Sequence, residues 1–265
     1  MNISDVLKKS SAQLDVELGN IINNYNTLSS ASPGASCAAV VKANAYGLGL
    51  EKVVPAIYYN TRCNIFFVAS LSEAITLRSI LVDATIYVFD GLFQDQVDTY
   101  LTHNIRPILN DLNQIKMWNG RRQPCAIHFD TGINRLGLSK NDTEKFLNST
   151  NDLNITHILS HLINSEDPDH KSNIDQLNKF TKITRELKNI PASLSNSAGI
   201  YLGANYHFDL VRPGIMLYGG NPGLPKRPSG IHDVITLSAR ILQIRNLNPG
   251  MSVGYKAIWT ARQPS

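Results

Sequence analysis

Lys42 stands at the end of an apolar run and directly before a glycine-bracketed turn. The run is Cys37 to Val41, and the turn covers residues 43–49. Because moving a charged amine out of water costs free energy, a lysine at the mouth of a buried strand indicates chemistry. Desolvation makes such an amine easier to deprotonate, and a neutral amine can form a Schiff base with an aldehyde cofactor. The alternative is an ordinary strand end whose lysine extends to solvent.

Eight short apolar or β-branched runs supply the elements that must position this lysine. The runs are residues 37–42, 65–69, 85–89, 105–109, 125–129, 155–160, 192–197 and 208–211. Helical periodicity lies between most of them, for example over residues 72–81 and 176–187. Strands that alternate with helices eight times predict the α/β class and a (β/α)₈ TIM-type barrel. A doubly wound open sheet is the alternative.

The barrel prediction also places a functional site. Active sites of this fold lie on loops at the carboxyl ends of the strands. Polar residues stand at five such ends: Lys42 ends the first strand, Arg135 follows the fifth, His161 ends the sixth, Ser197 ends the seventh and Arg212 follows the eighth. An open sheet would not bring all five to one mouth.

The loops after the seventh and eighth strands of a barrel often hold phosphate. Ser197 offers a hydroxyl and a backbone N–H there. Gly214 allows close backbone approach, and Ile215 stands at an expected helix start. The sequence therefore predicts a phosphate site, with a plain turn glycine as the alternative for Gly214.

Six segments in order resemble the alanine racemase family. They are residues 40–47 (Val-Val-Lys-Ala-Asn-Ala-Tyr-Gly), 130–137 (Asp-Thr-Gly-Ile-Asn-Arg-Leu-Gly), 159–161 (Leu-Ser-His), 195–199 (Ser-Asn-Ser-Ala-Gly), 211–219 (Val-Arg-Pro-Gly-Ile-Met-Leu-Tyr-Gly) and 252–255 (Ser-Val-Gly-Tyr). The resemblance covers essentially the whole chain. It implies pyridoxal 5'-phosphate as cofactor, interconversion of L-alanine and D-alanine for peptidoglycan synthesis, and a head-to-tail homodimer.

The resemblance also implies two catalytic bases on opposite faces of the cofactor. Lys42 would anchor pyridoxal phosphate as an aldimine and act on the proton of the D-enantiomer. Tyr255 would act on the other face, in the active site of the partner subunit. The alternative for Tyr255 is a half-exposed tyrosine on a β-strand.

Binding roles follow from the same resemblance. Tyr46 would donate to the phosphate, and Asn196 would contact the ring side of the cofactor. Arg135 would bond the ring hydroxyl and the substrate carboxylate. His161 would lie against the ring, although a core histidine satisfied by its neighbours is the alternative.

Arg212 bears on reaction type, because an arginine does not readily give its proton to the ring nitrogen. An unprotonated ring nitrogen restrains delocalisation of the carbanion into the cofactor ring, which favours racemisation over decarboxylation. The alternative role for Arg212 is a surface salt bridge. Two other functions stay open: a non-catalytic pyridoxal phosphate carrier on the same barrel, and a racemase for another amino acid such as serine. The chain departs from the family at His128, where many members have a carbamate-modified lysine near the arginine matched by Arg135.

Composition limits the classes of partner and the location that we expect for this chain. The chain has 265 residues, 43% of them hydrophobic, and a net charge of +4. No basic stripe interleaved with aromatic residues suggests nucleic acid, and no apolar run approaches the roughly 18 residues of a membrane span. The residues from Met1 to Asp5 show no secretory pattern, so a cytoplasmic enzyme is expected. Cys37, Cys63 and Cys125 are expected to be buried, without disulfides or a metal site.

We expect two domains, a barrel over residues 1–234 and the beginning of a β-rich domain over residues 235–265. The second part is predicted to hold two strands, 235–247 and 250–261, joined by Asn248-Pro249-Gly250. The resemblance implies that an early strand over residues 12–18 packs with the second domain. It also implies that the family continues beyond Ser265 with a sizeable C-terminal domain, which makes this chain a truncated racemase.

Overall fold

The computed structural model describes residues 10–265, so the segment from Met1 to Asp5 lies outside the described residues. Contacts divide the chain into two compact units. The larger unit is residues 16–235, and the smaller one combines residues 10–15 with residues 236–265.

A curved parallel sheet forms the centre of the larger unit. Its seven strands follow one another in chain order: β3 (Ala39–Val40), β4 (Ile65–Val68), β5 (Thr85–Val88), β6 (Arg106–Leu109), β7 (Pro124–His128), β8 (Asn154–Leu159) and β9 (Ala192–Ser193). Chain order without reversal is the topology that right-handed strand–helix–strand units produce.

The eighth strand position closes the ring. Strand β10 (Leu210–Val211) pairs in parallel with β2 (Ser36–Cys37), which immediately precedes β3. On its other side, the N–H groups of Asp209 and Arg212 donate to the carbonyls of Ala192 and Ser195 at 3.0 and 2.9 Å. The predicted (β/α)₈ barrel is confirmed. The first predicted strand is divided at Ala38, so that β2 pairs with β10 and β3 pairs with β4.

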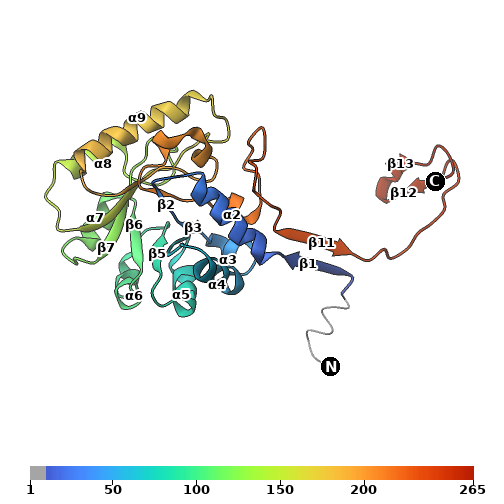
Figure 1. Ribbon diagram of the computed structural model, residues 1–265, viewed down its shortest axis with the longest axis horizontal. Helices are drawn as coiled ribbons and strands as arrows, with labels where there is room; N and C mark the ends of the chain where they lie inside the picture. The colour runs from blue at the N-terminus through green and yellow to red at the C-terminus, as the bar shows by residue number, and fades with distance from the viewer. Residues whose placement is uncertain (1–9) are drawn as a thin grey trace. The chain divides into compact units, whose positions relative to one another are not determined.

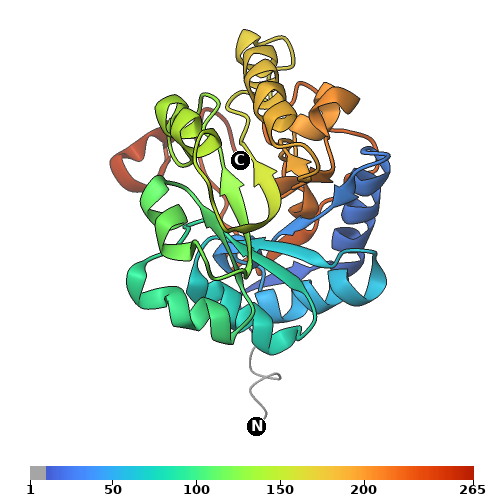
Figure 2. The same cartoon turned by 90° about the vertical axis from the view of Figure 1, so that its left-hand side faces the viewer.

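Helices surround the strands of the larger unit (Figure 2). They are α2 (Leu18–Ser30), α3 (Lys42–Tyr46), α4 (Leu50–Asn60), α5 (Leu71–Ile80), α6 (Val97–Thr102), α7 (Leu112–Trp118), α8 (Lys140–Leu147) and α9 (Lys171–Glu186). Short 3₁₀ turns complete the set: η1 (Gln94–Gln96), η2 (Gly199–Leu202), η3 (Ala204–Tyr206) and η4 (Ile215–Tyr218). The two helices expected from periodicity are confirmed as α5 and α9, and α9 begins five residues earlier than expected because the His170 side chain caps it at Ser172.

The strands bury both faces. One cluster, which includes Val40, Phe67, Tyr87 and Ile108, fills the inside of the barrel. A larger cluster lies between the sheet and the surrounding helices. It contains the strand residues that point outward, such as Phe66, together with buried residues of the helices. Burial on both faces explains why the strands read as continuous apolar runs. The three cysteines are buried, as expected.

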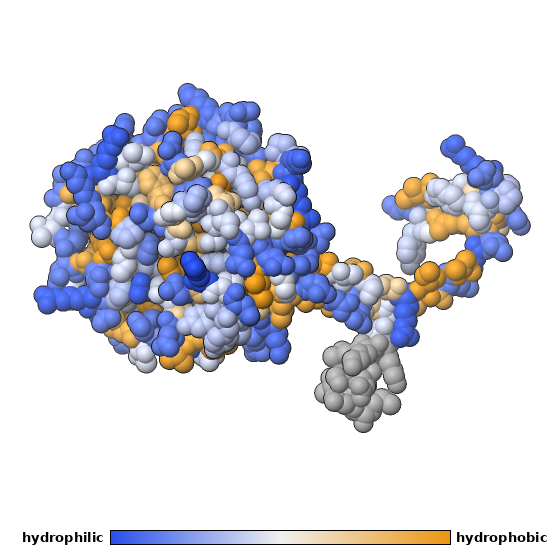
Figure 3. Space-filling model, in the orientation of Figure 1, coloured by the Kyte–Doolittle hydropathy of each residue, from blue (hydrophilic) through white to orange (hydrophobic). Residues whose placement is uncertain are grey.

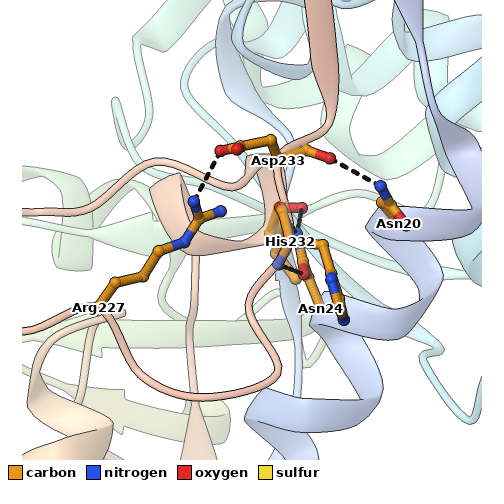
Figure 4. A network of polar contacts seen from close by, with 6 residues as sticks. Asn20, Asn24, Arg227, His232 and Asp233 are labelled. Carbon is orange, nitrogen blue, oxygen red and sulfur yellow. Dashed lines mark hydrogen bonds and ion pairs between the residues drawn. The ribbon is translucent and has the colours of Figure 1, made fainter.

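Helix α2 is fastened to the segment that follows the barrel (Figure 4). The buried amide of Asn24 donates to the carbonyls of Leu217 and His232 at 3.1 and 2.9 Å, and it accepts the His232 N–H at 2.7 Å. Asp233 pairs with Arg227 at 2.7 Å through its carboxylate. A buried amide with all these bonds satisfied fixes the register of the segment on α2.

The smaller unit contains two small sheets (Figure 1). Strand β1 (Ala12–Val16) pairs with β11 (Ile235–Ala239), and β12 (Ser252–Val253) pairs antiparallel with β13 (Trp259–Thr260) around the turn η5 (Tyr255–Ala257). The expected long strand over 235–247 is wrong, because regular pairing ends at Ala239. The expected single strand over 250–261 is also wrong, because positive φ angles at Gly254 and Lys256 reverse the chain within it.

Apolar side chains of the smaller unit stay exposed. Leu237, Leu242 and Tyr255 are 74%, 86% and 98% exposed, and Ala261 is the one buried hydrophobic residue described between 236 and 265. Figure 3 shows orange, hydrophobic atoms along the part of the chain that Figure 1 draws as β11 to β13. None of the helices in the described part of the chain combines the length and the apolar character needed to cross a membrane.

Candidate active site

A cavity of about 420 Å³ opens in the larger unit, among the loops that follow the barrel strands. Nine residues singled out from the sequence line it: Lys42, Tyr46, Arg135, His161, Asn196, Ser197, Arg212, Gly214 and Ile215. The tenth, Tyr255, belongs to the smaller unit and does not line the cavity. The fold therefore brings together polar side chains as far apart in the chain as Lys42 and Arg212.

Lys42 lies just beyond β3 and opens an unusual turn. The next four residues, Ala43 to Tyr46, all have φ between 53° and 55°, which is the left-handed helical region. Each such residue costs an L-amino acid roughly 1–2 kcal/mol. The turn is closed by the Gly47 N–H, which donates to the Ala43 carbonyl at 2.8 Å. This strained turn follows Lys42 directly and therefore sets the position of the backbone from which the lysine side chain extends.

Ser197, Gly214 and Tyr46 form a narrow cradle at one side of the cavity. The Ser197 hydroxyl oxygen accepts the N–H groups of Gly214 and Met216 at 2.9 and 3.4 Å, so its own hydrogen is left to donate into the cavity. A Cβ atom on residue 214 would overlap the Tyr46 hydroxyl. The Tyr46 ring is supported by Tyr218, with 4.6 Å between ring centroids. The cradle offers hydroxyl donors to an anion.

Arg212 is buried, which rules out the alternative of a surface salt bridge. It donates from Nη2 to the Ser160 carbonyl at 2.6 Å and from Nη1 to the Ser193 hydroxyl. Its guanidinium carbon lies 6.0 Å from the centre of the Phe67 ring. Among residues 10–265, no carboxylate forms an ion pair with Arg212. Burial lowers the pKa of Arg212 to about 9, so the side chain is still a cation at neutral pH.

Two histidines of the cavity are neutral at pH 7. Burial, followed by the charges of Arg212 and Arg135, lowers the pKa of His161 to about 3. Burial and Arg212 lower the pKa of His128 to about 3 in the same way. The His128 Nδ1 lies 2.9 Å from the side-chain oxygen (Oδ1) of Asn110, which requires the hydrogen on Nδ1 and leaves Nε2 as an acceptor. Within the described residues, this Nε2 is buried without a partner.

Sequence reasoning missed several polar residues of the site. Asp90 lines the cavity, and its pKa is raised by burial and by Glu73, while Lys42 lowers it. Ser165 also lines it and donates to the side-chain oxygen (Oδ1) of Asn196 at 2.8 Å. Asp90 could have been found, because it follows the third predicted strand just as Lys42 follows the first. Ser165 carries no such signal, since it lies inside a long loop.

The family model described as "Alanine racemase, N-terminal domain" matches residues 16–222. An alanine racemase of Rickettsia bellii is 43% identical over 237 residues, which cover 86% of this chain and 58% of that protein. One from Methylobacterium nodulans is 40% identical and is matched over 96% of this chain and 70% of its own length. The chain thus spans little more than half of the first of these relatives.

Solved structures give the same result. The crystal structure of alanine racemase from Bartonella henselae, described with covalently bound pyridoxal phosphate, superimposes with a TM-score of 0.89 and 38% identity over 97% of this chain and 74% of that one. The biosynthetic alanine racemase of Pseudomonas aeruginosa superimposes with a TM-score of 0.87 and 28% identity, over 96% of this chain and 73% of that one.

Proposed function

This chain belongs to the alanine racemase family, and we propose that it binds pyridoxal 5'-phosphate on Lys42 and interconverts L-alanine and D-alanine. The observation that carries the proposal is the cavity itself. It gathers an amine, a buried cationic guanidinium and a cradle of hydroxyl donors, which are the groups that such a cofactor needs.

The residues of the cavity fit the cofactor. The cradle of Ser197, Gly214 and Tyr46 has the donors for the phosphate, and it is too narrow at Gly214 for any side chain. Arg212 would direct a guanidinium N–H to the ring nitrogen. Because Arg212 is a cation at neutral pH, it donates a hydrogen bond there without transferring its proton.

When bound, pyridoxal phosphate supplies an electron sink for the negative charge left on the α-carbon of an amino acid. Lys42 would anchor the cofactor through Nζ and would then use the same nitrogen to remove or return the α-proton of D-alanine. Neutral His161 adds no positive charge beside Arg212. Arg135, at the cavity rim, would pair with the carboxylate of the substrate.

We infer that Tyr255 is the second base and acts on L-alanine in the cavity of a second copy of this chain. Its side chain is 98% exposed, so its hydroxyl is available to another molecule. This makes a head-to-tail homodimer part of the proposal. D-alanine for peptidoglycan is the proposed product, and the cytoplasm is the proposed location.

The test is α-proton exchange by the full chain with pyridoxal phosphate and L-alanine in deuterated water. Mass spectrometry and chiral separation should find deuterated D-alanine, and a parallel reaction with L-serine checks for the other substrate. Lys42→Ala should abolish exchange. Tyr255→Phe should slow proton removal from L-alanine more than from D-alanine, because the lysine face is intact.

Two results would contradict the proposal. A borohydride-trapped adduct on Lys42 without any exchange would leave a cofactor-holding protein and remove the racemase assignment. Exchange that persists in Lys42→Ala would remove the anchor.

A further inference from the structure

The Glu73 side chain links two segments that follow neighbouring barrel strands. Its Oε1 atom accepts the N–H groups of Ala43 and Asn44 at 2.5 and 3.3 Å, in the turn that follows Lys42. Its Oε2 atom accepts the N–H groups of Ala69 and Ser70 at 2.8 and 3.4 Å, at the end of β4. One carboxylate therefore bonds four backbone N–H groups, two from each segment.

The turn after Lys42 needs such support. Its internal bonds include those from the N–H groups of Gly47, Leu48 and Gly49 to the carbonyls of Ala43, Ala45 and Asn44, at 2.8, 3.1 and 3.0 Å. The N–H groups of Ala43 and Asn44 take no part in these bonds and donate to the Glu73 carboxylate instead. Left-handed residues other than glycine persist only where the surroundings hold them.

We propose that Glu73 is a positioning residue for Lys42, which it acts on by clamping the left-handed turn of residues 43–46 to the end of β4. This inference rests on the proposed function, because it concerns the lysine that would carry the cofactor. The clamp begins one residue after Lys42, so it fixes the backbone from which the amine extends into the cavity.

A carboxylate is required for this geometry. Glutamine has one acceptor oxygen, and its NH₂ group would face two of the four N–H groups. Glu73→Gln therefore breaks one half of the clamp. Ser70 provides a matched control, because its hydroxyl caps the same helix by accepting the Glu73 N–H at 3.4 Å and does not bond the turn.

The first experiment measures amide hydrogen exchange, resolved to single residues, on the full chain without cofactor. Losing a hydrogen bond to a charged group should make the amides of one half of the clamp, either Ala43 and Asn44 or Ala69 and Ser70, exchange about tenfold faster in Glu73→Gln. Ser70→Ala should leave the amides of Ala43, Asn44 and Ala69 unchanged. Exchange at the wild-type rate for all four amides in Glu73→Gln would overturn the proposal, whatever the protein catalyses.

The second experiment adds pyridoxal phosphate and follows borohydride trapping on Lys42 and the visible circular dichroism of the bound cofactor. A misplaced amine should slow trapping by about tenfold in Glu73→Gln and alter the dichroism. Ser70→Ala should leave both readouts as in the wild type. Equal slowing in the two variants would overturn the proposal and make Glu73 only a helix cap.

Glu73→Asp keeps the charge but is one methylene shorter, so it should also fail to bridge both segments, and it replaces Glu73→Gln if that variant does not fold. Should the wild type form no adduct on Lys42, the proposed function fails, while the exchange experiment still decides whether the clamp exists.

Discussion

Arg212 and Ser160 are joined by a hydrogen bond of 2.6 Å from the guanidinium to a backbone carbonyl, deep in the barrel. The other hydrogen-bond partner of the Arg212 guanidinium within residues 10–265 is the Ser193 hydroxyl, which is also neutral. Because neutral acceptors do not offset the charge of the buried Arg212 cation, that charge acts in full on a ligand that enters the cavity. It also costs stability, because nothing negative among the described residues offsets its desolvation.

Arg212→Gln should therefore not destabilise the chain without cofactor, and should raise its free energy of unfolding by about 1 kcal/mol. Urea unfolding measures this. Arg122→Gln, at a side chain that is 82% exposed, serves as control and should change stability by less than about 0.5 kcal/mol. A loss above about 2 kcal/mol in Arg212→Gln would show that the donors of Arg212 outweigh its buried charge.

Gly214→Ala should weaken the binding of pyridoxal phosphate by about tenfold or more, because the new methyl group displaces the Tyr46 hydroxyl from the cradle. Titration followed by absorbance measures the affinity. Gly19→Ala is the matched control, since nothing lies within 4 Å of a Cβ atom at that position. Unchanged affinity in Gly214→Ala would remove the cradle as the phosphate site.

Ser197→Ala should lower the free energy of unfolding by about 1–3 kcal/mol, because the buried N–H of Gly214 loses its acceptor. Denaturant unfolding without cofactor gives the value. Ser79→Ala, which removes an exposed hydroxyl that bonds only the Thr76 carbonyl, should have little effect. Equal stability of the two variants would mean that the Ser197 bonds contribute nothing measurable.

Acid should destabilise the chain without cofactor, and His128 should account for part of the loss. The pKa of His128 is about 3 in the folded state and about 6.5 when unfolded, so between these values the unfolded state binds the extra proton. The stabilisation is complete above pH 6.5 and is lost as the pH falls towards 3.

His128→Asn should remove a slope of up to about 1.4 kcal/mol per pH unit over that window. Unfolding free energies at pH 7, 6, 5 and 4 measure the slope of both proteins. The variant should keep some pH dependence, because the pKa of His161 and that of His157 are also lowered, to about 3 and about 4. Parallel curves for the wild type and His128→Asn would contradict the buried, neutral state of His128.

The barrel and the position of its mouth could be predicted because both depend on local pattern. Each strand reads as an apolar run, and each polar residue that follows a run lies at the same end of the barrel. The conformation after Lys42 could not be predicted, because it depends on Glu73, a carboxylate 30 residues away in the chain. The pairing of β1 with residues 235–239 was expected only from the family resemblance, because no local pattern specifies a contact between segments so far apart in the chain.

The division of the first strand into β2 and β3 has a consequence for the order in which the molecule assembles. Tyr218 donates to the carbonyl of Val40 across 178 positions of the chain, so the last junction of the ring carries a large loop-closure entropy and should form late in folding. Tyr46 and Gly214 face each other across that same junction. An anion bound at this junction would stabilise the closed barrel over the open one. A chain that has not yet joined residues 210–218 to the first strand would have no site for the anion.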